Sequence, residues 1–112
     1  MYIQLRKKKS SGYKATIYEQ GIYLNRAIAE TLQQYNFQYV HVYYKVEKNK
    51  LEVLLKKADR EDANTWKIAY RNGSMAFLFI RELFRIAKNK NTTTTTVEIS
   101  KDEVKLVFPL EE

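Results

Sequence analysis

The feature that most constrains the fold is an order of strand, turn, strand, helix and hairpin that occurs twice along the chain. The first copy covers about 15–57 and the second about 66–109. In the first copy, Gly21 supplies the positive φ that a tight turn needs, and Asn25 stands where a helix N-cap belongs. In the second, Asn72-Gly73 is a strong hairpin signal. We therefore predict an internal pseudo-repeat; the alternative is an α+β domain without internal symmetry.

The spacing of apolar residues predicts the elements of each copy. Apolar residues one, three and four positions apart predict a short helix from the Asn25 cap to about Gln34, and strict alternation predicts strands. A second short helix is expected over 80–88. The strands expected are 15–18, 22–24, 39–46 and 51–55 in the first copy, and 66–70, 75–79, 93–99 and 104–108 in the second.

Length and composition limit the class of protein. The 112 residues, of which 45% are hydrophobic, suit a single domain over 1–112 with one modest core. We expect an α+β fold of two β-β-α-β-β units that form a small barrel-like sheet with two short helices. The absence of cysteine excludes disulfides and thiolate metal sites. No apolar run approaches the length of a membrane span and no signal-peptide core follows Met1, so we expect a cytoplasmic protein without a membrane partner.

The positive charge lies in the first half of the chain. Residues 1–60 hold twelve Lys and Arg against five Asp and Glu, whereas residues 61–112 hold eight of each, so the first half carries the whole net charge of +7. Five of these charges belong to Lys14 and the run Arg6-Lys7-Lys8-Lys9, which form a basic N-terminal arm over 6–14. This asymmetry favours an anionic partner such as nucleic acid. The alternative for so short a run is a solubilising tail.

The expected strand 39–46 has two contrasting faces. One face combines aromatic rings with a cation, as surfaces that stack on bases or follow phosphates do: Tyr39, His41, Tyr43 and Lys45. The alternatives are that this face packs on another layer, or that its tyrosines form cross-strand pairs. The opposite face is expected to lie in the core: Val40, Val42, Tyr44 and Val46.

No pattern typical of an active site occurs in the sequence. It lacks GxSxG, HExxH, a glycine-rich phosphate loop and a cysteine nucleophile. The single histidine, His41, has no obvious group of carboxylates near it with which to hold a metal. We therefore expect a binding protein rather than an enzyme, with no cofactor and no metal.

The run Gly21-Ile22-Tyr23-Leu24-Asn25-Arg26-Ala27-Ile28, followed by the hairpin 39–55, resembles the AbrB-like swapped-hairpin family of prokaryotic DNA-binding proteins. Two such units in one chain are similar to the MraZ arrangement, in which tandem copies build the barrel that AbrB makes from two chains. Leu24-Asn25 stands here in place of the family's usual isoleucine-proline step. In that family, basic residues on the first strands and adjoining loops contact DNA, and the matching positions here are Lys14 and Arg26, near the arm.

The hypothesis is therefore a small basic protein of a prokaryote or phage that binds double-stranded DNA as an AbrB-like transcriptional regulator, as a monomer or a homodimer. The residues expected to neutralise phosphates are Arg6, Lys7, Lys8, Lys9, Lys14 and Arg26. The alternative is a protein-interaction module, such as a phage accessory or inhibitor protein, that uses the Tyr39, His41 and Tyr43 face or the threonine-rich edge 92–96. An RNA or acidic-lipid partner shares the charge evidence.

Overall fold

A computed structural model describes residues 1–3, 12–71 and 75–110. Over these residues the chain forms an α+β fold with two antiparallel five-stranded sheets and two helices. Sheet A has the strand order β6-β7-β2-β1-β8, and sheet B has the order β5-β3-β4-β10-β9. The strands of sheet A are β1 (Ala15–Tyr18), β2 (Gly21–Leu24), β6 (Ala69–Arg71), β7 (Met75–Leu78) and β8 (Thr92–Thr93). Those of sheet B are β3 (Tyr39–Glu47), β4 (Lys50–Ala58), β5 (Trp66–Lys67), β9 (Thr96–Ile99) and β10 (Glu103–Pro109).

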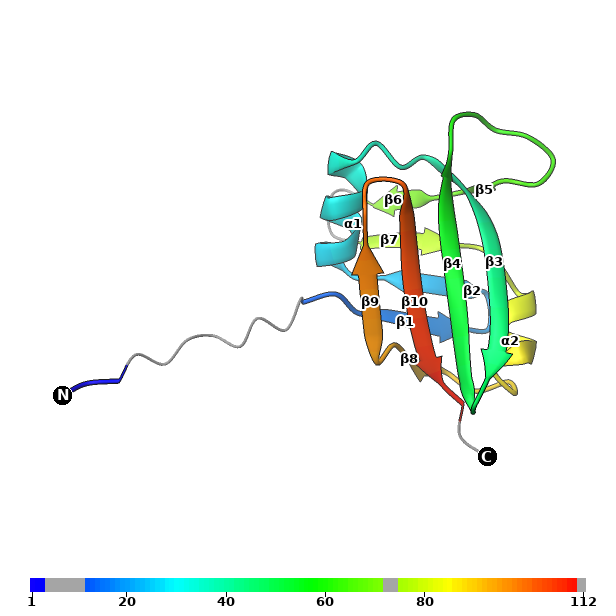
Figure 1. The fold of residues 1–112 in the computed structure, drawn as a ribbon. Helices are drawn as coiled ribbons and strands as arrows, with labels where there is room; N and C mark the ends of the chain where they lie inside the picture. Colours follow the sequence, from blue (N-terminus) through cyan, green and yellow to red (C-terminus); the bar gives the residue numbers. More distant parts are fainter. Residues whose placement is uncertain (4–11, 72–74, 111–112) are drawn as a thin grey trace.

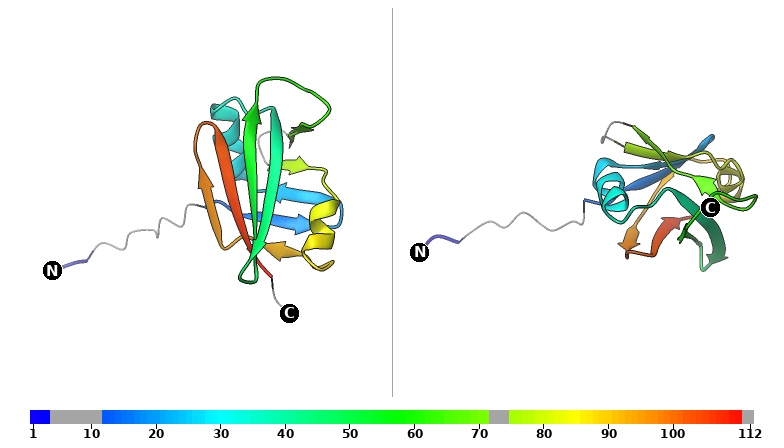
Figure 2. Two further views of the ribbon diagram at one scale, coloured as in Figure 1. Left: turned by 45° about the vertical axis from the view of Figure 1, so that its right-hand side comes forward. Right: turned by 90° about the horizontal axis from the view of Figure 1, so that it is seen from above.

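The two sheets lie face to face, with their strands crossing rather than running alongside one another (Figure 1). Helix α1 (Arg26–Gln34) and helix α2 (Glu82–Ile86) lie at opposite sides of this sandwich. The view from above in Figure 2 separates the two layers and shows a helix at each side. Among the described residues, no further layer covers the outer face of either sheet (Figures 1 and 2).

The prediction of one barrel-like sheet is wrong, because the described strands form two separate sheets. The chain changes sheet inside two of the predicted strands. The predicted strand 66–70 divides into β5, which pairs with β3, and β6, which pairs with β7. The predicted strand 93–99 divides into β8, which pairs with β1, and β9, which pairs with β10.

Backbone hydrogen bonds hold these two corners. At the first corner, the Ile68 N–H donates to the Gln38 carbonyl at 2.9 Å. At the second, the Thr94 N–H donates to Ala15 in sheet A at 2.9 Å, and the Thr95 N–H donates to Val107 in sheet B at 2.8 Å. The threonine-rich segment is therefore a corner between the sheets that continues into the sheet edges β8 and β9.

The hydrophobic core lies between the inner faces of the sheets. Alternate residues of each strand point inward, as the period of a strand requires. The fully buried aliphatic residues of sheet A include Ile17, Ile22, Leu24 and Leu78, and those of sheet B include Leu51, Val53, Leu55 and Leu106, with Phe108 beside them. Helix α1 adds Ile28, Ala29 and Leu32, and α2 adds Leu83.

The first helix begins and ends as the sequence predicts. The Asn25 side-chain oxygen accepts a hydrogen bond from the Ile28 N–H at 3.2 Å, which confirms the N-cap. The second helix is shorter than the predicted 80–88. Its first residue follows Arg81, whose side chain makes no capping bond, and its end is followed by Lys88 and Asn89 at φ 61° and 57°. These left-handed residues end the helical backbone.

Tight turns join the hairpins. Lys48 and Asn49 both have positive φ, at 51° and 60°, as the two central residues of a type I′ turn between β3 and β4 require. Gly21 follows the turn between β1 and β2, where it begins β2 opposite Tyr18. The predicted turn at Asn72-Gly73 lies outside the described residues, although Arg71 and Met75 on either side of it are paired.

Candidate functional site

The structure places the backbone of Lys14 beside the start of α1, where Arg26 is the first helical residue. The Asn25 backbone N–H donates to the Lys14 carbonyl at 3.0 Å, so the residue before β1 lies against the start of α1. The Asn25 side-chain amide donates to the Gly12 carbonyl. Asn25 thus joins Gly12 and Lys14, at the end of the basic arm, to the first turn of α1.

The charges at this joint differ in their surroundings. Lys14 is exposed. The Arg26 guanidinium forms an ion pair with Glu30 one helical turn later, with an Nε to Oε1 distance of 2.7 Å, and both side chains are exposed. An exposed pair of this kind contributes little to stability, and a phosphate could replace the carboxylate. Arg6, Lys7, Lys8 and Lys9 lie outside the described residues.

The predicted interaction face of β3 is the outer face of sheet B. Tyr39 and His41 are half-buried by their neighbours, and 52% of Tyr43 is exposed. The Lys56 ammonium lies over the Tyr43 ring, 5.6 Å from its centroid. Within the described residues, no second layer covers this face. Its residues do have cross-strand neighbours on β4, such as Lys56 opposite His41 and Leu54 opposite Tyr43.

Lys45, the fourth residue of this face, has acidic neighbours. Its ammonium lies 3.5 Å from both Glu47 and Glu52. The charge of Glu52, followed by that of Glu47, raises the pKa of Lys45 above its ordinary value. Lys105 also contacts Glu52, at 3.2 Å. Lys45 therefore belongs to a local charge network on the surface of sheet B, so a bound phosphate would have to compete with two carboxylates for it.

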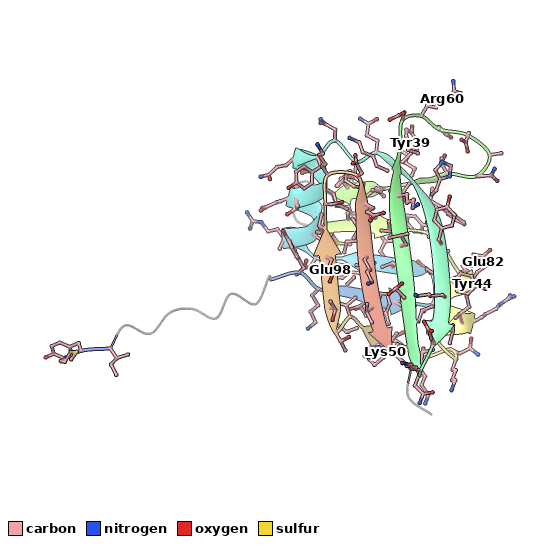
Figure 3. All side chains as sticks on the ribbon, in the orientation of Figure 1. Tyr39, Tyr44, Lys50, Arg60, Glu82 and Glu98 are labelled. Atoms are coloured by element: carbon pink, nitrogen blue, oxygen red, sulfur yellow. The ribbon has the colours of Figure 1, made fainter. Side chains whose placement is uncertain are left out.

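Two residues predicted to lie in the core are exposed. Val40 is fully buried on the inner face of β3, but 56% of Tyr44 and 53% of Val46 are exposed. The reason is their position on the sheet. Beyond Val40, the described chain places no strand on the other side of β3, so Tyr44 and Val46 lie at an open edge of sheet B. Figure 3 shows Tyr44 at this margin of sheet B.

A second aromatic surface, which the sequence reasoning missed, covers the outer face of sheet A. Tyr18 and Phe79 are 41% and 55% exposed, and Tyr23 and Phe77 are half-buried between them. The Tyr18 and Tyr23 rings meet edge to face at 6.4 Å between centroids, and the Phe77 and Phe79 rings are 4.8 Å apart. Tyr23 stands directly opposite Phe77 across the β2 and β7 pair. We call these four residues the sheet A aromatic face.

Two shallow depressions border the sheet A aromatic face. One, of about 440 Å³, is lined by Gln20, Trp66, Phe79, Arg81 and Glu82. The other, of about 240 Å³, is lined by Gln20, Arg71, Met75, Phe77 and Phe79. Aromatic, methionine and arginine side chains are the types enriched at protein interfaces. Strand alternation could have placed the four rings on one face, but only the sheet topology shows that no described element covers that face.

No protein-family model, curated protein or solved structure matches this chain.

Within the described residues, His, Asp and Glu side chains form no group of three or more that could hold a metal ion. No helix in the same part of the chain is long and apolar enough to cross a membrane. His41 lies beside Lys56 on the sheet B surface, opposite a cation rather than a carboxylate.

Proposed function

We propose that this protein binds double-stranded DNA through its basic N-terminal arm and the joint where the arm meets the fold. The residues assigned to phosphate contact are Arg6, Lys7, Lys8, Lys9, Lys14 and Arg26. The observation that carries the proposal is the Asn25 joint. It holds Gly12, Lys14 and the first residue of α1 together, so the arm is attached next to the exposed Arg26.

This joint supports an electrostatic binding mode. Contacts to phosphates position a protein on a duplex but carry no sequence information, so the arm gives affinity for any duplex sequence. The acidic residues of the second half equal its basic ones in number, which leaves the first half as the anion-binding half. Specific regulation of transcription, as proposed from the AbrB-like resemblance, requires base contacts in addition.

The strand pairing supports the proposed internal duplication. In sheet A, the β1-β2 hairpin pairs through β2 with β7 of the β6-β7 hairpin. In sheet B, the β3-β4 hairpin pairs through β4 with β10 of the β9-β10 hairpin. Both pairings join the second strand of each hairpin, as two units related by a two-fold axis would. We therefore propose that the chain is an internal duplication of two AbrB-like units, which here form two sheets instead of one barrel, and we propose it together with the DNA-binding function.

The test is fluorescence anisotropy of a labelled random-sequence duplex titrated with the protein at several salt concentrations. If six phosphates are contacted, log K falls with log salt with a slope of about −5. We expect tight binding at low salt and a steep loss at physiological salt. Absence of binding at low salt would contradict the proposal and leave the arm as a solubilising tail.

The second candidate function is a protein-interaction module that uses the sheet A aromatic face. The observation that favours it is the two pairs of contacting rings on one face, with Tyr18 and Phe79 exposed. An exposed apolar patch of this kind marks an interaction site or lowers solubility, and Tyr, Phe and Met are residue types enriched at protein interfaces.

The double variant Tyr18→Ser and Phe79→Ser tests this second function. We expect proteins retained from the source organism by the wild-type chain to be lost from the variant, as measured by quantitative mass spectrometry, because the variant removes the two exposed anchors. The double variant Tyr35→Ser and Gln34→Ser, which changes exposed residues at the end of α1, is the control. Equal retention by both variants would contradict a role for this face. Duplex affinity should not change in either one.

A further inference from the structure

One edge of sheet B is open along most of its length. Strand β5 pairs with β3 only at Tyr39 and Val40. From position 41 to 47, β3 is paired with β4 on one side, and the described chain supplies no strand on the other. Proteins protect such edges with short strands, bulges, proline or charge, because an open edge is a template for another strand.

The unpaired backbone groups of this edge belong to alternate residues. The Gln38 carbonyl points away from β4, since it accepts from Ile68 of the neighbouring segment. Along a strand, N–H and C=O groups point to the same side at every second residue. Val42, Tyr44 and Val46 therefore present both backbone groups to the open side. The type I′ turn after Glu47 agrees with this, because Glu47 is paired with Lys50 across that turn and so bonds toward β4.

The side chains at the open edge are apolar on one face of the strand. Tyr44 and Val46 lie on the inner face and are more than half exposed. On the outer face, Tyr43 is also half exposed, and Lys45 and Glu47 carry opposite charges. A partner strand would thus find hydrogen-bonding groups, apolar contacts and charges of both signs.

We propose that a second copy of this chain pairs with the edge, β3 against β3 in antiparallel order, with Tyr44 on the two-fold axis. In this register, each side chain of the open segment lies opposite a partner side chain with which it can make a favourable contact. On the inner face, Tyr44 meets the partner's Tyr44 and Val42 meets the partner's Val46. On the outer face, Tyr43 meets the partner's Lys45, and His41 meets the partner's Glu47. Pairs of aromatic residues, such as the two Tyr44 rings, are among the cross-strand neighbours that stabilise sheets. A lysine over a tyrosine ring is attracted to it, and the Glu47 carboxylate can accept a hydrogen bond from the partner's His41.

Length and charge both favour this register over its neighbours. A two-fold axis at Tyr44 is the one position that pairs the whole open segment 41–47 with itself. An axis at Lys45 places two lysines directly opposite each other, which destabilises an antiparallel pair. An axis at Tyr43 brings the partner's Val46 against Val40, whose edge β5 already occupies. The resulting interface is isologous and joins two copies of sheet B into one continuous sheet.

The first test is the mass of the full chain in solution, measured by light scattering after size exclusion. We expect twice the mass of the chain for the wild type. Tyr44→Glu should halve this mass, since it puts two carboxylates opposite each other on the axis. Tyr43→Glu is the matched control; it should remain dimeric, because its carboxylate faces the partner's Lys45. Circular dichroism checks that both variants are folded.

The second test uses the absence of cysteine in the chain. Residues in a hydrogen-bonded antiparallel pair have Cα atoms about 5.5 Å apart, which lies within disulfide range. Tyr44→Cys should therefore form a covalent dimer under mild oxidation. His41→Cys should not, because the two copies of position 41 lie at opposite ends of the interface.

Three results would overturn the proposal. A monomeric wild type at the highest soluble concentration would do so. So would a dimer that persists in Tyr44→Glu, which would move the interface elsewhere, for example to the sheet A aromatic face. Equal cross-linking of the two cysteine variants would exclude the register. None of these readouts depends on DNA, so the dimer and the DNA-binding proposal fail independently.

Discussion

Alanine at Gly21 is expected to destabilise the fold more than any other single methyl group added to the described glycines. A Cβ at this position would lie 1.8 Å from the Leu78 carbonyl oxygen and 2.9 Å from the Ile80 backbone nitrogen. Both neighbours are backbone atoms, so no side chain can rotate away. The next pair of the same ladder, Ile22 with Leu78, holds the two strands together. Relief therefore requires β2 and β7 to separate.

We expect the free energy of unfolding to fall by roughly 3 kcal/mol, within the range of steric and backbone effects. For a domain of this size, the melting temperature would fall by roughly 13 °C. Thermal unfolding followed by circular dichroism measures the change. The control is Gln20→Ala at the exposed neighbouring position, which should change stability by less than about 0.5 kcal/mol. Equal melting temperatures for the two variants would show that β7 does not approach Gly21 so closely.

Charge reversal of the arm is expected to have the largest effect on function. Replacing Lys7, Lys8 and Lys9 by glutamate removes three of the six proposed phosphate contacts and adds repulsion. We expect affinity for duplex DNA to fall by well over tenfold and the salt slope to become shallower by about 2.7. Because phosphate contacts do not read bases, the loss should be the same for every duplex sequence.

The matched control reverses Lys88, Lys90 and Lys101, three exposed lysines of the second half. Both triple variants lower the formal net charge from +7 to +1, so a comparison separates the position of charge from its total. Anisotropy titrations on one duplex at a fixed salt concentration give the result. Equal losses of duplex affinity in the two variants would indicate an effect of total charge and not of its position. Unchanged affinity in the arm variant would exclude the arm from the interface.

Local elements were well predicted from the sequence because local signals determine them. The Asn25 cap and the apolar spacing after it predicted α1 to within a residue, and strict alternation predicted the β3 and β4 hairpin. The assignment of strands to sheets could not be predicted in the same way. Whether a strand such as 66–70 continues or turns a corner at Ile68 depends on partners that lie far away in the chain.

Burial was predictable only where a second layer covers the strand. Alternation correctly placed Tyr44 and Val46 on the inner side of β3, yet both are exposed, because they lie at the open edge of sheet B and no described element covers them. The sheet A aromatic face was missed for the same reason. The alternation of side chains along a strand indicates which residues share a face of the sheet. It does not indicate whether another layer covers that face.

For the candidate DNA interface, the basic residues could be identified from the sequence. The structure added the hydrogen bonds by which Asn25 connects Gly12 and Lys14 to α1. Lys14 and Arg26 are close because Asn25 bonds to the Lys14 backbone. The contribution of residues 6–9 stays a prediction, since these lie outside the described residues.

The central strand pairs of both sheets have a consequence for synthesis on the ribosome. Ile22 finds its partner at Leu78, and Leu55 finds its partner at Val104. When only the first half has emerged, the hairpins β1-β2 and β3-β4 each lack the strand that completes their sheet, and isolated hairpins are marginal in water. Assembly must wait for residues 75–109 of the second half, so contacts of long sequence separation should make folding slow.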